Sequence, residues 1–196
     1  MGDENVNRIP ALLSSSELWV RAVVYGGLLF LIFGFVPICC LNSSRFGKVV
    51  TRNDCLQIAV AVKAYRTHQG QFPALPKDGR ALADFENAEL MGILAGKDKV
   101  NSSREIVYLE VREAPLKAHF LNGIHPQTGA FVDPWGHAYR VVFDSDNDSR
   151  VESPYEDLPA QIVDGVIVWS LGKDGIQGVK GNPRQFKGSD DVISWQ

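Results

Sequence analysis

Two consecutive patterns of hydrophobic and polar residues dominate the N-terminal third of the chain. Residues 22–41 form an apolar run without a charged side chain, and a run of about 20 such residues is long enough for a helix to span a bilayer. In residues 52–69, apolar positions recur at the helical spacing i, i+3, i+4, i+7. We therefore predict one long helix from Trp19 to Gly70, with its first half in a membrane and its second half packed under a small domain.

The amphipathic segment also predicts which helix face is buried. Leu56 and Val60 are expected to widen the apolar stripe. Gly70 suits the position after a helix end, and Pro73 prevents the helix from resuming. The stripe itself consists of Cys55, Ile58, Ala59, Val62 and Tyr65.

Three interpretations of the apolar run remain open. Its length and the flanking Trp19 and Arg21 favour a membrane helix. A cleaved secretory signal would require a small-x-small cleavage site, and none follows the run. A lipoprotein signal ending at Cys39 or Cys40 would require small residues before the cysteine, where Pro37 and Ile38 stand.

The rest of the chain predicts an α+β fold. A shorter helix is expected over residues 80–95, and weak alternation predicts a strand at 106–111. Two further strands are expected at 139–143 and within 161–170. The order of a long helix, a short helix and a few antiparallel strands indicates a sheet that leans on the long helix. The predicted organisation is a disordered segment at 1–18, a transmembrane helix at 19–42 and a globular head at 43–196.

Composition narrows the function. The formal net charge is −3, so no basic surplus points to nucleic acid. The three cysteines show no framework spacing, which argues against disulfides and a cysteine-ligated zinc site. The sequence contains no H-E-x-x-H, G-x-S-x-G or glycine-rich phosphate loop. We therefore expect neither an enzyme nor a small-molecule substrate.

Three sequence blocks resemble a known family. AYRTHQGQFP (64–73) is similar to the end of the long helix in type IV pilin-like proteins. DPWGHAYRVVF (133–143) resembles the DPWG-x-x-Y turn and first strand of the major pseudopilin of type II secretion systems. VWSLGKDG (168–175), followed by DDVISW (190–195), resembles the calcium loop and C-terminal tryptophan of that pseudopilin.

The resemblance implies a long helix, its first half in the bacterial inner membrane, and a periplasmic head with a small antiparallel sheet. It implies a structural activity, since pseudopilins assemble with one another through their N-terminal helices into a short fibre that drives protein export. It also implies Ca²⁺ as a ligand, bound by the Leu171 carbonyl and the Asp174 carboxylate, with Asp190 or Asp191 closing the loop. Taken from the residues alone, these aspartates can equally be solvated turn residues.

The N-terminus departs from the family. Prepilin peptidase cuts after a Gly that precedes Phe- or Met-Thr-Leu-x-Glu, and no Gly precedes Glu17 here. We therefore predict that the chain is not cut, which leaves open whether it joins a fibre. Arg45, Lys48 and Arg52 follow the apolar run, and this charge bias alone would favour a cytoplasmic head.

A second acidic segment contains Asp144, Asp146 and Asp148. An EF-hand would need Gly at its sixth position and Glu at its twelfth, where Ser149 and Tyr155 stand. We expect this segment to be a solvated hairpin tip.

Two alternatives to a fibre subunit remain. The first is a free-standing, membrane-anchored binding protein with the same fold. The second is a membrane-tethered hydrolase that uses Asp and His residues, although the histidines are scattered. The core of the head is expected to contain Trp135, Trp169 and Trp195.

Overall fold

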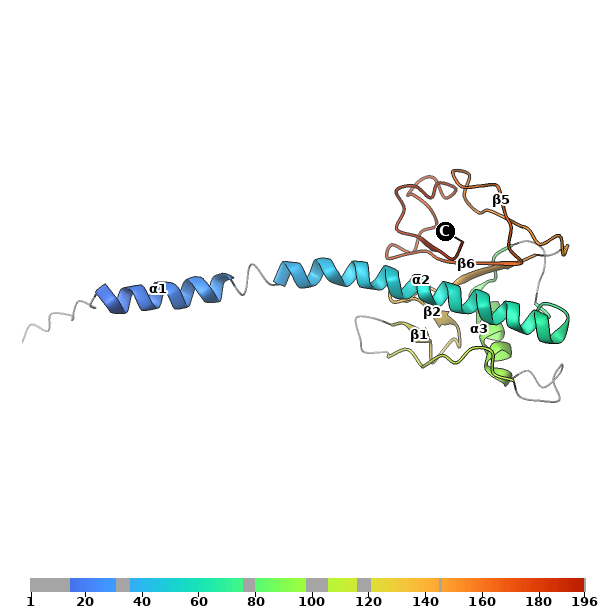
Figure 1. Ribbon diagram of the computed structural model, residues 1–196, viewed down its shortest axis with the longest axis horizontal. Helices are drawn as coiled ribbons and strands as arrows, with labels where there is room; N and C mark the ends of the chain where they lie inside the picture. Colours follow the sequence, from blue (N-terminus) through green and yellow to red (C-terminus); the bar gives the residue numbers. More distant parts are fainter. Residues whose placement is uncertain are drawn as a thin grey trace, which may run out of the picture. The chain divides into compact units, whose positions relative to one another are not determined.

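The computed structural model describes residues 15–30, 36–75, 80–97, 106–115, 121–144 and 146–195 (Figure 1). Contacts divide the chain into an N-terminal unit that ends at Arg45 and a unit Phe46–Gln196, here called the head. Each unit is described separately.

The N-terminal unit contains helix α1, Ser15–Phe30, and the beginning of helix α2, Val36–Gln69. Helix α1 begins inside the segment 1–18, and residues 1–14 lie outside the described part of the chain. The predicted continuous helix from Trp19 to Gly70 cannot be followed through its whole length, because residues 31–35 also lie outside the described part of the chain. Within the described ranges, no helix combines the length and the apolar character needed to cross a bilayer.

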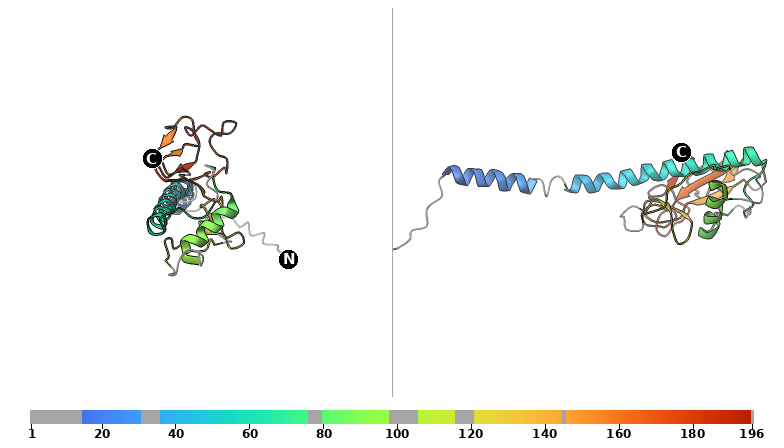
Figure 2. Two further views of the ribbon diagram at one scale, coloured as in Figure 1. Left: turned by 90° about the vertical axis from the view of Figure 1, so that its right-hand side faces the viewer. Right: turned by 90° about the horizontal axis from the view of Figure 1, so that it is seen from below.

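The part of α2 in the head buries the predicted stripe, in which each side chain is at most 5% exposed: Cys55, Ile58, Ala59, Val62 and Tyr65. The prediction that Leu56 and Val60 widen it is wrong, since they are 42% and 64% exposed. The rest of the head lies along one side of α2 (Figure 2), and Leu56 and Val60 lie at the margin of that contact, beside Tyr108 and Glu110. Gly70 follows the helix with φ +73°, as predicted, and its N–H bonds the Arg66 carbonyl at 2.8 Å.

A polar pair is buried beside this stripe. The Tyr139 hydroxyl donates to Asp54 Oδ2 at 3.0 Å, across 85 positions of sequence. Burial raises the pKa of Asp54, and the hydrogen bond from Tyr139 opposes that rise. The pair ties the long helix to the central sheet.

The central sheet is antiparallel with strand order β3–β6–β7. Strands β3, Arg140–Phe143, and β6, Val166–Ser170, confirm the two predicted strands. Strand β7, Val192–Ile193, adds the third and pairs Trp169 with Ile193.

Every residue of β6 is buried, because both faces of the sheet are covered. Side chains alternate between faces along a strand. Val166 and Val168 join α2 in one apolar cluster, whereas Ile167 and Trp169 pack with Tyr155 in a second. Of the three tryptophans predicted to be in the core, Trp169 is 2% exposed, and Trp135 and Trp195 are half-buried.

Two short hairpins and one helix complete the head. Strand β1, Gly123–Ile124, pairs with β2, Phe131–Val132, and β4, Val151–Glu152, pairs with β5, Gln161–Ile162. Helix α3, Asp84–Gly92, continues as a π-helical turn, η2, Ile93–Lys97. In Figures 1 and 2, the C-terminal loops lie on one side of the head, and α3, β1 and β2 lie on the other.

Helix α3 begins four residues later than predicted. The Glu86 carboxylate accepts the Ala83 N–H at 2.6 Å at the helix start and is also paired with Arg80. The hydrogen bonds from Arg80 and from Ala83 hold the pKa of Glu86 at about 2. Residues 80–83 are therefore the approach to the helix and not its first turn.

The predicted strand at 106–111 is wrong. The amide groups of Tyr108 and Leu109 both bond the Leu94 carbonyl, at 2.8 and 3.1 Å. The backbone of this segment thus pairs with the end of a helix and not with a neighbouring strand. The α+β class with small antiparallel sheets is confirmed.

Candidate functional site in the aspartate-rich loops

The DPWG block forms a turn held by one carboxylate. Asp133 is fully buried, and its Oδ1 accepts the N–H groups of Trp135 and His137, each at 2.9 Å. Gly136 has φ +97°, a conformation that glycine adopts readily. Burial raises the pKa of Asp133, and the hydrogen bonds that its carboxylate accepts partly offset this rise.

The same turn is bonded to the loop that follows β6. The Ser170 hydroxyl donates to Asp133 Oδ2 and accepts the Gly172 N–H at 3.0 Å. His137 Nδ1 lies 2.9 Å from the Gly172 carbonyl oxygen and must donate to it, because a carbonyl only accepts. The DPWG and LGKDG blocks, more than 30 positions apart, are therefore one hydrogen-bonded unit. Ser170 lies inside the VWSLGKDG block, but nothing in the sequence indicated its role.

Asp190 closes this loop from the C-terminal side. Its Oδ2 accepts the N–H groups of Lys173 at 2.7 Å and Asp174 at 3.3 Å. Gly172, with φ +66°, lies so close that a Cβ there would be 2.5 Å from Asp190 Oδ1. The glycine is thus required both by its conformation and by the space.

Asp191 is held from two other directions. Its Oδ2 accepts the Tyr155 hydroxyl and the Gly178 N–H, both at 2.6 Å. Burial raises the pKa of Asp191, and the charges of Asp190 and Asp174 raise it further. Tyr155 comes from the connection between β4 and β5, and no pattern in the sequence predicted its role.

The four residues predicted to bind calcium gather around one loop, but their oxygens have different surroundings. Asp174 is exposed, and its Oδ1 accepts the Ile176 N–H at 2.9 Å. Asp190 Oδ1 and Asp191 Oδ1 are buried and have no hydrogen-bond partner among the described residues. Leu171 begins the loop directly after β6. Carboxylate oxygens are the hard donors that Ca²⁺ prefers, but oxygens from Asp174, Asp190 and Asp191 do not all lie within 4.8 Å of one another in this structure.

The segment predicted to be a hairpin tip has a different structure. It leaves the end of β3, and Asp144 is 1% exposed, so the prediction of a fully solvated tip is wrong for that residue. Asp146 and Asp148 are exposed. One carboxylate oxygen from each of the three lies within 4.8 Å of the others, and in the described part of the chain no other such group was found. This acidic triad, Asp144, Asp146 and Asp148, could hold a metal ion.

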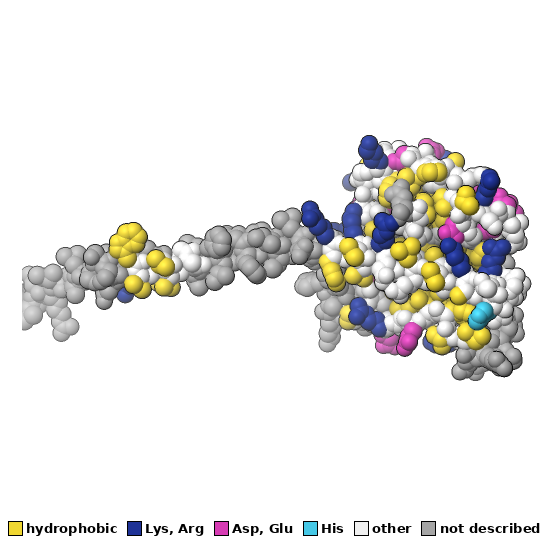
Figure 3. Space-filling model, in the orientation of Figure 1, with side chains coloured by type: hydrophobic (Ala, Val, Ile, Leu, Met, Phe, Trp, Pro, Cys, Tyr) yellow, Lys and Arg dark blue, Asp and Glu magenta, His cyan; other side chains and the backbone are white. Residues whose placement is uncertain are grey.

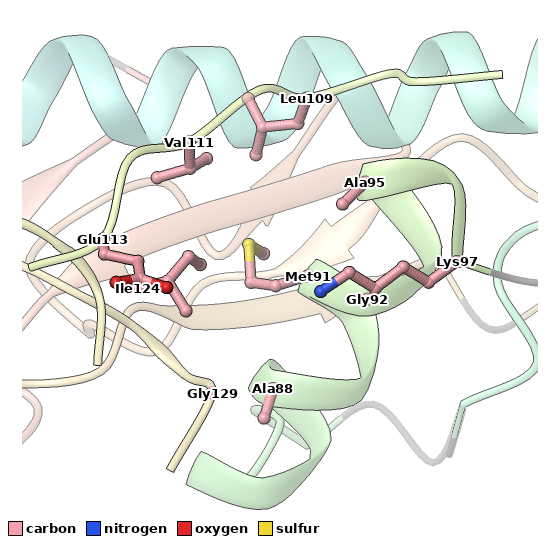
Figure 4. Close-up of a pocket in the computed structure, with 10 residues that line it drawn as sticks. All are labelled: Ala88, Met91, Gly92, Ala95, Lys97, Leu109, Val111, Glu113, Ile124 and Gly129. Atoms are coloured by element: carbon pink, nitrogen blue, oxygen red, sulfur yellow. The ribbon is translucent and has the colours of Figure 1, made fainter. Parts of the chain in front are cut away.

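A cavity of about 420 Å³ lies elsewhere in the head, between helix α3 with η2 and the segment that carries Leu109 and Glu113. Figure 4 shows Met91 pointing into it, with Lys97 and Glu113 on opposite sides. Its lining is otherwise apolar or glycine. The cavity is separate from both aspartate-rich loops.

The histidines do not form a shared site in the part of the chain that is described. His68 packs edge-on against Tyr108, and His137 belongs to the DPWG unit. His119 lies outside the described residues.

Comparison with known proteins found no matching family model, no matching curated protein and no matching solved structure. The likeness to pseudopilins therefore rests on the sequence blocks.

Proposed function

We propose that this chain is a non-enzymatic, structural, pilin-like subunit of a type II secretion or type IV pilus-like apparatus. The observation that supports it best is the bonding of the DPWG turn to the LGKDG loop, and of that loop to Asp190. The segments DPWGHAYRVVF, VWSLGKDG and DDVISW, which resemble one pseudopilin in sequence, are thus also hydrogen-bonded to one another.

In this proposal the C-terminal loop binds Ca²⁺ through the Leu171 carbonyl and the carboxylates of Asp174, Asp190 and Asp191. Bound Ca²⁺ would neutralise like charges that otherwise repel one another in the loop. The protein's own groups keep the loop closed: Asp190 holds the amides of residues 173 and 174, and Tyr155 fixes Asp191.

The proposed anchor is residues 19–42, which place the chain in the bacterial inner membrane as a single-pass protein with its head in the periplasm. The support is the uncharged run 22–41 with its flanking Trp19. Full-length protein should stay with membranes after alkaline carbonate washing, whereas a fragment that begins at Ser43 should be released. Release of both forms would contradict the anchor.

Association with copies of itself or with other pseudopilins would use the N-terminal helices. In the head, α2 exposes Phe46, Val49, Leu56 and Val60 to solvent. Figure 3 shows hydrophobic side chains together with Lys and Arg on the face along which α2 runs. Exposed apolar patches of this kind are typical of protein contact surfaces.

A photo-crosslinking amino acid at Val60 tests the proposed assembly in cells. Val163 is a matched control, because it is also an exposed valine, at 82% against 64%, but lies between β5 and β6. We expect crosslinks from position 60 to the same chain or to another pilin-like membrane protein, and few from position 163. Equal yields from the two positions would count against the fibre subunit.

The cavity beside α3 favours a second candidate function, a free-standing anchored binding protein with the same fold. Its apolar lining and its single Lys and Glu suit a small amphipathic ligand. Mass spectrometry of the extracted protein helps to separate the two candidates. An uncut N-terminus together with no crosslinks from position 60 would favour the binding protein, whereas cleavage between Leu12 and Arg21 would favour the fibre subunit.

A further inference from the structure

The Asp144 side chain is buried with one carboxylate oxygen that lacks a hydrogen-bond donor among the described residues. It is 0% exposed, and its Oδ1 has no hydrogen-bond partner among the residues that the structure describes. A buried carboxylate oxygen without a donor loses its hydration without compensation. Asp144 directly follows β3, and its backbone N–H donates to the Gly165 carbonyl at 3.0 Å, so the backbone that carries this side chain is held beside the sheet.

The two exposed aspartates of the triad lie on the same side as this buried group. A carboxylate oxygen from each of Asp144, Asp146 and Asp148 lies within 4.8 Å of the others. Backbone hydrogen bonds fix them in place: Ser149 N–H donates to Asp144 Oδ2 at 2.9 Å, and Arg150 N–H donates to Asp148 Oδ1 at 2.7 Å. The three groups are therefore held together by the loop and not by chance side-chain positions.

The surrounding protein supplies only part of the positive charge that three carboxylates attract. Arg66 of α2 places Nη1 3.9 Å from Asp144 Oδ2, and its Nη2 donates to Asn147 Oδ1 at 3.2 Å. Arg66 also stacks on Phe72, with its guanidinium carbon 4.4 Å from the ring centre. One guanidinium opposite three carboxylates leaves a formal charge of about −2, the charge that a divalent cation neutralises.

We propose that Asp144, Asp146 and Asp148 form a second cation site, selective for Ca²⁺ and independent of the C-terminal loop. Their spacing is that of the first, third and fifth ligands of a calcium loop. The sixth position of such a loop needs a sharp turn, and Ser149 supplies it with φ +62° although it is not a glycine. The loop has Tyr155 where a bidentate Glu would stand, so the site is weak, with a dissociation constant of about 10⁻⁴–10⁻³ M, as in extracellular modules.

The consequence is a cation-dependent connection between the sheet and α2. The metal orders the loop after β3, and that loop carries Asn147, which accepts a hydrogen bond from Arg66. This site shares no residue with the C-terminal loop. A test of cation binding at the triad can therefore succeed or fail independently of the tests of the proposed function.

The test is a Ca²⁺ titration of the ¹⁵N-labelled full-length chain in mild detergent. The amide signals of Ser149 and Arg150 report the triad, and those of Lys173 and Gly178 report the C-terminal loop. We expect the triad signals to move with half-saturation at about 0.1–1 mM Ca²⁺. The Asp146→Asn/Asp148→Asn variant should weaken that response at least tenfold and leave the signals of the C-terminal loop responsive. Both replaced side chains are exposed, so the fold should persist.

The matched control is Glu89→Gln/Glu110→Gln, which removes two exposed carboxylates elsewhere in the head and should leave the titration unchanged. Three results would overturn the second site. The first is no movement of the Ser149 and Arg150 signals up to ~10 mM Ca²⁺, which is ten times the highest expected half-saturation concentration. The second is an unchanged response in the Asp146→Asn/Asp148→Asn variant. The third is equal movement of these signals with Mg²⁺. The last would indicate screening, because Mg²⁺ demands an octahedral site and dehydrates reluctantly.

Discussion

In the C-terminal loop, Asp190 and Asp191 receive hydrogen bonds from Lys173, Gly178 and Tyr155, whereas in the acidic triad three carboxylates approach one another. Both loops use aspartate oxygens to hold backbone N–H groups, but only in the triad do three carboxylates come within 4.8 Å of one another among the described residues. The contrast teaches that a run of aspartates in sequence says little about metal binding until the partners of each oxygen are known.

The largest expected effect tests how closely the C-terminal loop packs its backbone against Asp190. Gly172→Ala should destabilise the head by roughly 2–5 kcal/mol, the sum of a left-handed alanine and an overlap with Asp190. Gly181→Ala is the matched control: its φ is +89°, but a Cβ there meets nothing within 4 Å, so about 1–2 kcal/mol is expected. Chemical unfolding measures both. Equal losses would show that Asp190 does not constrain position 172.

The next effect concerns calcium in the C-terminal loop. A hundredfold excess of Ca²⁺ over its dissociation constant adds roughly 2.7 kcal/mol, or about 5–10 °C in melting temperature for a domain of this size. Mg²⁺ should give far less. Asp174→Ala should remove most of the rise, whereas Asp146→Asn/Asp148→Asn and the exposed control Glu110→Ala should keep most of it. A melting temperature that is the same with Ca²⁺ and in calcium-free buffer would exclude the site.

The smallest effect separates the two loops by pH. Burial raises the pKa of Asp191 in the folded state above its value in the unfolded chain. At a pH above the folded-state pKa, ionised Asp191 therefore lowers the free energy of unfolding. This destabilisation disappears as the pH falls and Asp191 becomes protonated. Ca²⁺ binds the ionised form. The stabilisation by Ca²⁺ at the C-terminal loop should therefore begin to shrink at a pH above the ordinary aspartate pKa of about 3.9.

At the triad, we expect Asp146 to stay available for Ca²⁺ at a lower pH than Asp191. The hydrogen bond from the Asp148 N–H lowers the pKa of Asp146, so this carboxylate stays ionised further into the acid range. Melting curves and amide titrations between neutral and acid pH, with and without Ca²⁺, test the difference. The same pH dependence in both loops would refute the distinction drawn from their hydrogen bonds.

Periodicity predicted the parts of the fold where burial is regular. The buried stripe around Ile58 and the strands β3 and β6 follow directly from spacing. Leu56 and Val60 were assigned to the core wrongly, because a pattern does not show where the contact between α2 and the rest of the head ends. Strands such as β1 and β7 have two residues each, too few for any periodic signal.

The candidate sites were predicted less completely. The blocks around Asp133 and Asp174 were found by resemblance, but Tyr155 was missed, since it reaches Asp191 from 36 positions away. The burial of Asp144 was missed as well. Its only signal was its place directly after the apolar strand that ends at Phe143.

The pairing of β7 with the middle of the sheet has a consequence for the order of events during synthesis. Strand β6 is complete only when Val192 and Ile193 lie beside it, and the Cys55 thiol donates to the Val192 carbonyl across 137 positions of sequence. Contacts of such long range slow folding, because the intervening chain must be closed into a loop first. The cluster that buries the apolar face of α2 includes Val166 and Val168, so while the head emerges from the ribosome part of this face stays uncovered until β6 is made, and Cys55 lacks its partner until β7 is made. A chaperone that shields this face during translation would have a longer time to act here than on a domain built from neighbouring segments.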